Sequence, residues 1–195
     1  MILILKNLNK LKMKITTILI SMITSVAGFC NNLPGSILPI KEFDPLGFSS
    51  GMSKQDMYLM REAELMHGRV GMMASAGFLT QEIFHPMFDG KITGPSIDHI
   101  PQLPVYANIA MTIPIVFSEA YRINKGWDSP SNGFQALKPN YYPGDLGFDP
   151  LNLYPKTVEK QREMQTKELQ NGRLGMLAAA GFLAQETFNH QPWLQ

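Results

Sequence analysis

Two stretches of this chain, ELMHGRVGMMASAGFLTQEIF at residues 64–84 and ELQNGRLGMLAAAGFLAQETF at residues 168–188, are near copies of each other. Fourteen of their 21 positions are identical, so an internal repeat organises the fold. Each copy places a Glu, then a His or Asn, then an Arg inside a mostly apolar stretch. Charged residues in such surroundings need partners, so the repeat indicates chemistry as well as packing.

The repeat extends into the segment before each copy. The tetrapeptide FDPL occurs at residues 43–46 and again at residues 148–151, at nearly the same distance ahead of the two copies. Segments rich in Pro and Gly separate the apolar stretches and mark loops. The sequence therefore predicts one all-α domain at residues 31–195. Its expected helices lie at about 54–84, 104–123 and 158–188.

The first 30 residues have the features of a targeting segment. Four lysines precede an apolar run at residues 15–26, and Ser25-Val26-Ala27 resembles a small-residue cleavage site. The run is short for a membrane span, although a short membrane anchor is the alternative. We expect residues 1–30 to be a signal segment outside the folded domain.

Composition excludes several classes of protein. The net charge is +1 and no basic patch carries interleaved aromatics, so nothing indicates nucleic-acid binding. Cys30 is the single cysteine, which excludes an intrachain disulfide and a cysteine-based metal site. The chain is rich in Met (13) and Gly (16), residues that suit irregular apolar surfaces and close approach of backbones.

The distribution of charge favours a membrane protein. If all three predicted helices span a bilayer, the N-terminal segment and the loop between the second and third helices share one side. That side holds nine Lys and Arg residues, whereas the opposite loop, 85–103, holds only Lys91. The first and third helices exceed the thickness of the hydrocarbon core and should tilt or protrude. A soluble three-helix protein with basic loops is the alternative.

The charged residues of the repeat predict how its two copies pack. On a helical wheel, Glu64 and Arg69 flank a stripe of small and apolar residues, as do Glu168 and Arg173 in the second copy. Small residues let helix backbones come close in a membrane. If a pseudo-two-fold axis relates the copies, Glu64 meets Arg173 and Arg69 meets Glu168. Each paired carboxylate then keeps a lone pair that can coordinate a cation, although a purely structural double ion pair is the alternative.

Four neutral polar side chains lie away from this stripe. His67 and Asn171 face outward, and Gln81 and Gln185 follow 14 residues later in nearly the same direction. Each offers a lone pair suited to the axial position of a magnesium ion held in a ring. For one histidine alone a place in the core is the favoured interpretation, but the repeated row favours ligands.

The middle helix carries a further candidate pair. Glu119 and Arg122 are spaced i, i+3, so the carboxylate is neutralised and keeps a spare oxygen. A surface pair whose Arg reaches the membrane interface is the alternative. The spacing of Glu64 and His67 also matches di-iron helix bundles, but Asn171 stands where that motif needs a second His.

The motifs FDPLGF, ELMHGRVGMMA, GDLGFDPL and ELQNGRLGMLAAAGFLAQE closely resemble those of the light-harvesting chlorophyll-binding antenna proteins of plastids. The second copy is more similar to the red-lineage branch, the fucoxanthin–chlorophyll a/c proteins, than to the green plant branch. The resemblance covers roughly residues 43–185. It implies a multi-pass thylakoid protein with three transmembrane helices, the first and third forming a crossed pseudo-two-fold pair, and no enzymatic activity.

The resemblance also implies which residues bind pigment. The implied ligands of chlorophyll magnesium are Glu64, His67, Gln81, Glu119, Glu168, Asn171 and Gln185. Arg69 and Arg173 are implied to neutralise the carboxylates of the opposite copy. The two FDPL segments are implied to hold the ends of two carotenoids. Their residues are Phe43, Asp44, Pro45, Leu46, Phe148, Asp149, Pro150 and Leu151.

From this resemblance we expect chlorophyll a, chlorophyll c and fucoxanthin-type carotenoids as cofactors. The expected partners are thylakoid lipids, neighbouring antenna subunits and the core of photosystem I or II. The expected function is to transfer excitation energy to a photosystem. A photoprotective, quenching member of the same family is the first alternative, and a di-iron membrane oxidoreductase is a remote one.

Overall fold

The computed structural model describes residues 33–36, 44–84, 92, 94–133 and 135–191. Within these residues the regular structure is helical apart from one isolated bridge between Trp127 and Leu137. The prediction of an all-α protein is confirmed for this part of the chain. The expected signal segment, residues 1–30, and Phe43 lie outside the described residues.

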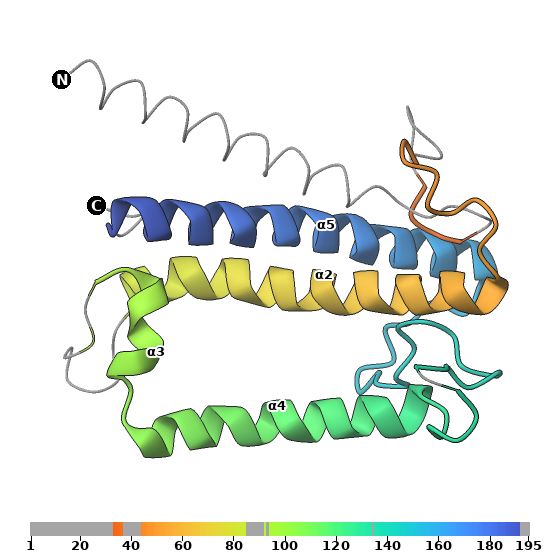
Figure 1. The fold of residues 1–195 in the computed structure, drawn as a ribbon, viewed down its shortest axis with the longest axis horizontal. Coiled ribbons are helices and arrows are strands. Elements are labelled where there is room, and N and C mark those ends of the chain that lie inside the picture. The colour runs from red at the N-terminus through yellow and green to blue at the C-terminus, as the bar shows by residue number, and fades with distance from the viewer. Residues whose placement is uncertain (1–32, 37–43, 85–91, 93, 134, 192–195) are drawn as a thin grey trace.

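Three long helices dominate the described part of the chain: α2 (Lys54–Ile83), α4 (Val105–Gly126) and α5 (Val158–Asn189). The short helices η2 (Ser96–Asp98) and α3 (His99–Gln102) precede α4. Helices α2 and α5 lie side by side, whereas α4 stands apart from this pair (Figure 1). The outer helices match the expected ranges to within one residue at each end, and α4 continues to Gly126 instead of ending near residue 123.

Local sequence explains where the helices begin and end. The hydroxyl of Ser53 caps α2 by accepting a hydrogen bond from the Asp56 backbone N–H at 3.2 Å. Pro104, in extended conformation, directly precedes α4. Helix α5 is capped by His190, which follows its last residue and has a left-handed backbone with φ of 48°, a common helix terminator. These signals place the copies of the repeat near the middle and end of two helices of similar length.

Glycines bring the backbones of α2 and α5 into contact. A Cβ atom added to Gly68 would lie 3.0 Å from the Cα of Gly172, and the reverse distance is also 3.0 Å. A Cβ on Gly71 would lie 2.7 Å from the backbone nitrogen of Met176, and Gly175 makes the matching contact with α2. The contacts are reciprocal, as a two-fold relation between the copies requires. The small-residue stripe predicted from the sequence is therefore where the two helices meet.

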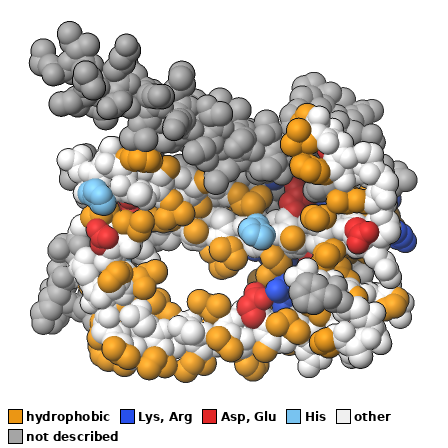
Figure 2. Space-filling view, in the orientation of Figure 1, with side chains coloured by type: hydrophobic (Ala, Val, Ile, Leu, Met, Phe, Trp, Pro, Cys, Tyr) orange, Lys and Arg blue, Asp and Glu red, His pale blue; other side chains and the backbone are white. Residues whose placement is uncertain are grey.

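No single helix in the described part of the chain is both long and apolar enough to pass as a membrane span. One bent pair does pass by length and composition, formed by residues 96–102 and α4, which meet at 110°. The side chains of α4 are nevertheless strongly apolar and outward-facing, with Ile113, Ile115 and Phe117 at 62%, 61% and 75% exposure. Figure 2 shows hydrophobic side chains spread along this helix. Such a continuous apolar surface marks a region that contacts lipid, ligand or protein.

Candidate functional site

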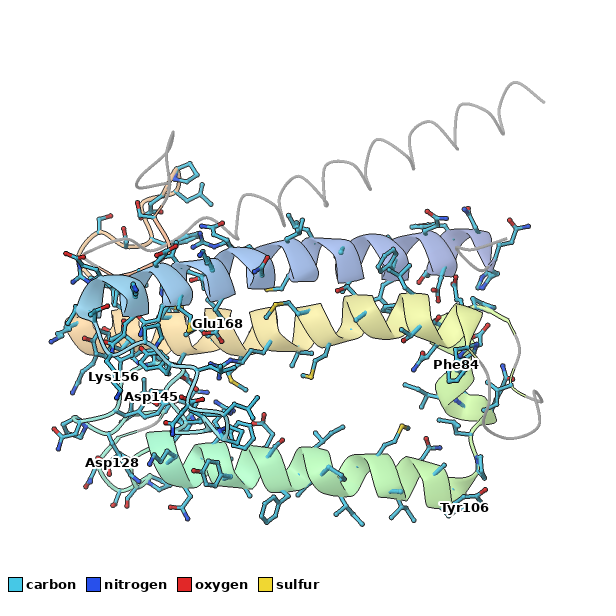
Figure 3. All side chains as sticks on the ribbon, turned by 180° about the vertical axis from the view of Figure 1, so that it is seen from behind. Phe84, Tyr106, Asp128, Asp145, Lys156 and Glu168 are labelled. Carbon is cyan, nitrogen blue, oxygen red and sulfur yellow. The ribbon has the colours of Figure 1, made fainter. Side chains whose placement is uncertain are left out.

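Two reciprocal ion pairs join α2 to α5. Arg173 donates from Nε to Oε1 of Glu64 at 2.8 Å, and its Nη2 lies 2.8 Å from the same oxygen. Arg69 donates from Nε to Oε1 of Glu168, also at 2.8 Å. Figure 3 shows Glu168 at the seam between the two helices. The cross-pairing predicted from the repeat is confirmed.

Two of the candidate ligands on α2, Glu64 and His67, each keep a lone pair. Oε2 of Glu64 is buried and accepts no hydrogen bond within the described part of the chain, although Arg61 Nη1 lies 3.5 Å away. Nδ1 of His67 lies 2.7 Å from the carbonyl oxygen of Ala63. Because that oxygen can only accept, the neutral form of the ring carries its proton on Nδ1 and keeps a lone pair on Nε2. A carboxylate oxygen that accepts no hydrogen bond and an imidazole oriented in this way both fit a magnesium ion held in a porphyrin-type ring.

The remaining amide candidates are spread along the outer surface of the pair. Asn171 and Gln81 are exposed, and Gln185 is half-buried. The structure does not gather them into one cluster, so each would serve a separate ligand. Among the described residues, no group of three or more His, Cys, Asp or Glu could hold a metal ion.

The third candidate carboxylate lies on α4. Oε2 of Glu119 accepts hydrogen bonds from Arg122 Nε at 2.9 Å and from Nη2 at 2.7 Å. The Glu119 side chain is 42% exposed, whereas that of Arg122 is 16% exposed. The pair predicted from the i, i+3 spacing is therefore present, with the arginine on its more buried side.

Glu62 is a functional candidate that the sequence reasoning missed. It is 1% exposed, and its Oε2 accepts hydrogen bonds from the backbone N–H of Gly144 at 2.7 Å and from the hydroxyl of Tyr141 at 3.0 Å. Its Oε1 lies 3.4 Å from Nη1 of Arg122. Burial, together with the Glu62 carboxylate, raises the pKa of the Tyr141 hydroxyl above its ordinary value, so this group remains a donor. Glu62 thus joins α2 to α4 and to the loop that follows α4.

A Pro-Gly segment that we call the first strap, Pro34 and Gly35, lies against α5. The Gly35 N–H donates to the hydroxyl of Thr166 at 3.1 Å, and its carbonyl accepts from Arg173 Nη1 at 3.0 Å. Gly35 has φ of +112°, and a Cβ there would collide with the side chain of Leu169. Only glycine fits this combination of left-handed backbone and close approach.

The second strap, Pro143 and Gly144, lies against α2 in the matching way. The Gly144 carbonyl accepts from Arg69 Nη2 at 2.9 Å, while its N–H donates to Glu62. Its φ is +81°, and a Cβ there would lie 2.7 Å from Cδ1 of Leu65. Each arginine of the two cross-pairs therefore binds one carboxylate and one strap carbonyl, which holds both guanidinium groups in place.

The two FDPL segments form equivalent turns. Asp44 accepts from the backbone N–H groups of Phe48 at 2.9 Å and Ser49 at 2.7 Å, four and five residues on. Asp149 accepts from the residues four and five positions on, both at 2.9 Å. The hydrogen bonds from Ser49 hold the pKa of the Asp44 carboxyl below its ordinary value. Each turn thereby presents its Pro and its large apolar side chain to the outside.

A groove of about 660 Å³ adjoins the second turn. Its wall is formed by the second strap, the second FDPL turn and the helix pair, and includes Leu65, Arg69, Phe148, Leu153 and Leu169. Most of this lining is apolar, and Phe148 is 82% exposed at its edge. The groove can accept an elongated apolar molecule whose end reaches the loop side of the seam.

A family model described as chlorophyll A-B binding protein matches residues 29–187 of this chain. The chain belongs to this chlorophyll-binding family. The resemblance inferred from the FDPL and E-x-x-H/N-x-R motifs is thereby confirmed. Members of the family are light-harvesting, pigment-binding proteins and not enzymes.

Relatives of this chain include fucoxanthin-chlorophyll a-c binding proteins and a light-harvesting complex stress-related protein. The chain is 52% identical over 169 residues to the chloroplastic fucoxanthin-chlorophyll a-c binding protein of Isochrysis galbana, covering 85% of this chain and 81% of that protein. It is 45% identical over 168 residues to light-harvesting complex stress-related protein 3.2 of Chlamydomonas reinhardtii, covering 83% and 65%. A fucoxanthin-chlorophyll a-c binding protein of Chattonella marina var. antiqua is 36% identical over 159 residues, covering 79% and 68%.

Proposed function

We propose that this chain is a light-harvesting antenna subunit of the thylakoid membrane that binds chlorophyll a, chlorophyll c and fucoxanthin-type carotenoids. The observation that carries the proposal is the pair of reciprocal Glu–Arg contacts, which neutralise two carboxylates and leave Oε2 of Glu64 without a hydrogen bond among the described residues. The pigments, when bound, absorb light and pass on excitation; the protein supplies their spacing and orientation.

We assign the magnesium ligands by the same chemistry. Glu64, Glu168 and Glu119 each bind an arginine through one oxygen, and a carboxylate has lone pairs to spare for a cation. His67 offers Nε2, and the amide side chains offer their oxygens. The proposed ligands on the helix pair besides Glu64 and Glu168 are His67, Gln81, Asn171 and Gln185.

We further propose that α2, α4 and α5 cross the membrane, with α2 and α5 as a crossed pair. The charges that lower the hydropathy of the pair are largely neutralised by one another, which reduces their free-energy penalty in a low-dielectric interior. The exposed face of α4 is apolar over most of its length and suits contact with lipid or pigment. Lys and Arg residues gather on one side of these helices.

The FDPL turns and the adjoining groove suit the ends of two carotenoids. Leu46 and Leu151 are 72% and 74% exposed on the two turns, with Pro45 and Pro150 beside them. A long polyene lying along the helix pair would cover these side chains. Neighbouring antenna subunits and the core of photosystem I or II are the proposed protein partners.

A second candidate function follows from the 45% identity to a stress-related light-harvesting protein. A member of that kind would quench excitation more than it transfers it. The fluorescence lifetime of the purified complex separates the two: a lifetime shortened relative to that of an antenna complex of the same pigment content would favour quenching.

The proposed function is tested by extracting pigment from the purified protein and separating it by chromatography. We expect chlorophylls a and c together with a fucoxanthin-type carotenoid, and a colourless preparation from native membranes would contradict the proposal. His67→Leu and Asn171→Leu should each lose about one chlorophyll per protein. Thr80→Val is the matched control, because among the described residues that hydroxyl bonds to carbonyls of its own helix.

A further inference from the structure

We propose that Glu62 is the positioning residue for the pigment site on α4, because it fixes Arg122 and, through Arg122, the carboxylate of Glu119. The inference rests on the proposed function, since it concerns a chlorophyll bound at Glu119. Glu62 itself accepts hydrogen bonds from three groups and is not a ligand.

The first observation is the buried charge of Glu62. At 1% exposure, a carboxylate is strongly destabilised unless a cation and hydrogen-bond donors compensate it. The donors come from Gly144 and Tyr141, and the cation is Arg122, whose Nη1 lies 3.4 Å from Oε1. Removing the negative charge would leave Arg122 facing a neutral group on its inner side.

The second observation is that one guanidinium serves both carboxylates. Nη1 of Arg122 faces Glu62, whereas Nε and Nη2 donate to Glu119. The guanidinium is a rigid planar fork, so fixing one of its edges fixes the direction of the other. The ring of Trp127, with its centroid 5.7 Å from Cζ, also holds this plane. The orientation of the Glu119 carboxylate therefore depends on Glu62.

The third observation is the isolation of α4. It does not pack along α2 or α5, and Figure 2 shows an opening between α4 and the helix pair, with charged side chains at one end. The contact between Glu62 and Arg122 joins α2 to α4 across this separation. A pigment bound at Glu119 would be placed relative to the helix pair by this contact.

The fourth observation separates positioning of α4 from anchoring of a strap. Thr166 is the repeat counterpart of Glu62, 104 residues later, and its hydroxyl holds the first strap at Gly35 as Glu62 holds the second strap at Gly144. A neutral hydroxyl is thus sufficient to bind a strap. Binding the second strap therefore does not require the negative charge of Glu62. That charge instead pairs with Arg122, which belongs to α4.

Glu62→Gln tests the inference in the full-length protein reconstituted with its pigments. Glutamine keeps the size of the side chain, and with its oxygen toward Gly144 and Tyr141 it presents its NH₂ group, a donor without charge, to Arg122. We expect chlorophyll content to fall by about one per protein, with the same change in visible circular dichroism as in Glu119→Leu. Thr166→Val, which weakens the other strap, should retain all chlorophyll.

The double variant Glu62→Gln with Glu119→Leu makes the test specific. If Glu62 acts through Glu119, the double variant loses no more chlorophyll than Glu119→Leu alone. A further loss in the double variant, or full chlorophyll content in Glu62→Gln, would overturn the inference.

Glu62→Asp is the second variant in case Glu62→Gln does not assemble. It keeps the charge and should assemble with reduced occupancy of the same single site. Full occupancy, or a loss spread over all chlorophylls, would overturn positioning by Glu62. Wild-type protein that binds no chlorophyll would instead refute the proposed function, so the two failures are distinguishable.

Discussion

The half of the molecule organised on α2 and the half organised on α5 use the same parts for the same contacts. In each half a strap glycine with positive φ lies over an arginine, and that arginine holds the glutamate of the other helix. The halves differ at the repeat position that is Glu62 in the first half and Thr166 in the second. The matching parts hold the pair together, and the unmatched charge attaches the third helix. Repetition therefore provides the scaffold, and departures from repetition provide the asymmetric site.

The largest effect should come from breaking the more buried of the two cross-pairs. The side chains of Glu64 and Arg173 are 12% and 13% exposed, against 34% and 27% for Glu168 and Arg69. Arg173→Leu leaves the Glu64 charge without its main partner, and an unpaired charge at the centre of a span costs about 2.5–3.5 kcal/mol or more. We expect loss of pigment and of assembly, measured by chlorophyll content and thermal denaturation.

The matched comparison is Arg69→Leu, which should be milder because its pair is more exposed. The double variant Glu64→Leu with Arg173→Leu removes both charges and should denature at a higher temperature than Arg173→Leu alone. Equal, unimpaired pigment content in Glu64→Leu and Arg173→Leu would show that the cross-pairs do not support the fold.

The next effect concerns the seam between the halves. In Gly71→Ala the new Cβ would lie 2.7 Å from the backbone of α5, so the helices must separate and the variant should lose about 1–3 kcal/mol of stability. Gly77→Ala on the same helix meets nothing within 4 Å and should gain about 0.5–1 kcal/mol through helix propensity. Thermal denaturation should therefore shift in opposite directions, and a shift of the same sign would place the seam elsewhere.

The straps should respond alike if the halves are equivalent. Gly35→Ala and Gly144→Ala combine a left-handed backbone with a contact on a leucine side chain, and the backbone alone costs about 1–2 kcal/mol. Gly51→Ala is the control, because its φ is +84° but a Cβ there meets nothing within 4 Å. Both strap variants should denature at a lower temperature than Gly51→Ala. A strap variant with the same denaturation temperature as Gly51→Ala would show that its strap does not stabilise the helix pair.

The smallest effect should come from the FDPL turns. Asp44→Asn and Asp149→Asn each weaken two hydrogen bonds from backbone amides on an exposed turn. We expect a slight fall in denaturation temperature and a partial loss of carotenoid, similar in the two variants. Carotenoid content per chlorophyll measures the outcome, and loss from only one variant would break the equivalence of the turns.

Lowering the pH should destabilise the Asp44 turn, as the substitution Asp44→Asn does. The folded pKa of this carboxyl lies below its unfolded value, so the turn is fully stabilised above the unfolded pKa. Its contribution is lost as pH falls through the depressed folded pKa. Asp44→Asn should therefore flatten the dependence of stability on pH in the acid range, and an unchanged acid profile would contradict this assignment.

The repeat was sufficient to predict much of this structure. Near-identity of two long stretches predicts the outer helices, and a two-fold relation between them predicts the pairing of Glu64 with Arg173. The spacing of Glu119 and Arg122 predicted the pair on α4. These features are local or follow from symmetry, so one sequence contains enough information to find them.

Other contacts could not be predicted because their partners are distant and unrelated by the repeat. Glu62 binds groups 60 to 82 residues later in the chain, and no periodic pattern in the sequence predicts such a contact. The Pro-Gly dipeptides at residues 34–35 and 143–144 predict loops. Their recurrence also indicates that the repeat is longer than the helical copies. The position of α4 relative to α2 and α5 depends on these contacts, so it could not be predicted from the sequence either.

The contact between Gly68 and Gly172 has a consequence for the speed of energy migration. The missing side chains let two backbones touch, with a Cβ at either position only 3.0 Å from the opposite Cα. In the proposed function, pigments bound to the two helices would move apart if these backbones separated. Since dipolar coupling between chromophores weakens steeply with distance, a methyl group added at either glycine would slow the excitation hops between pigments bound to different helices.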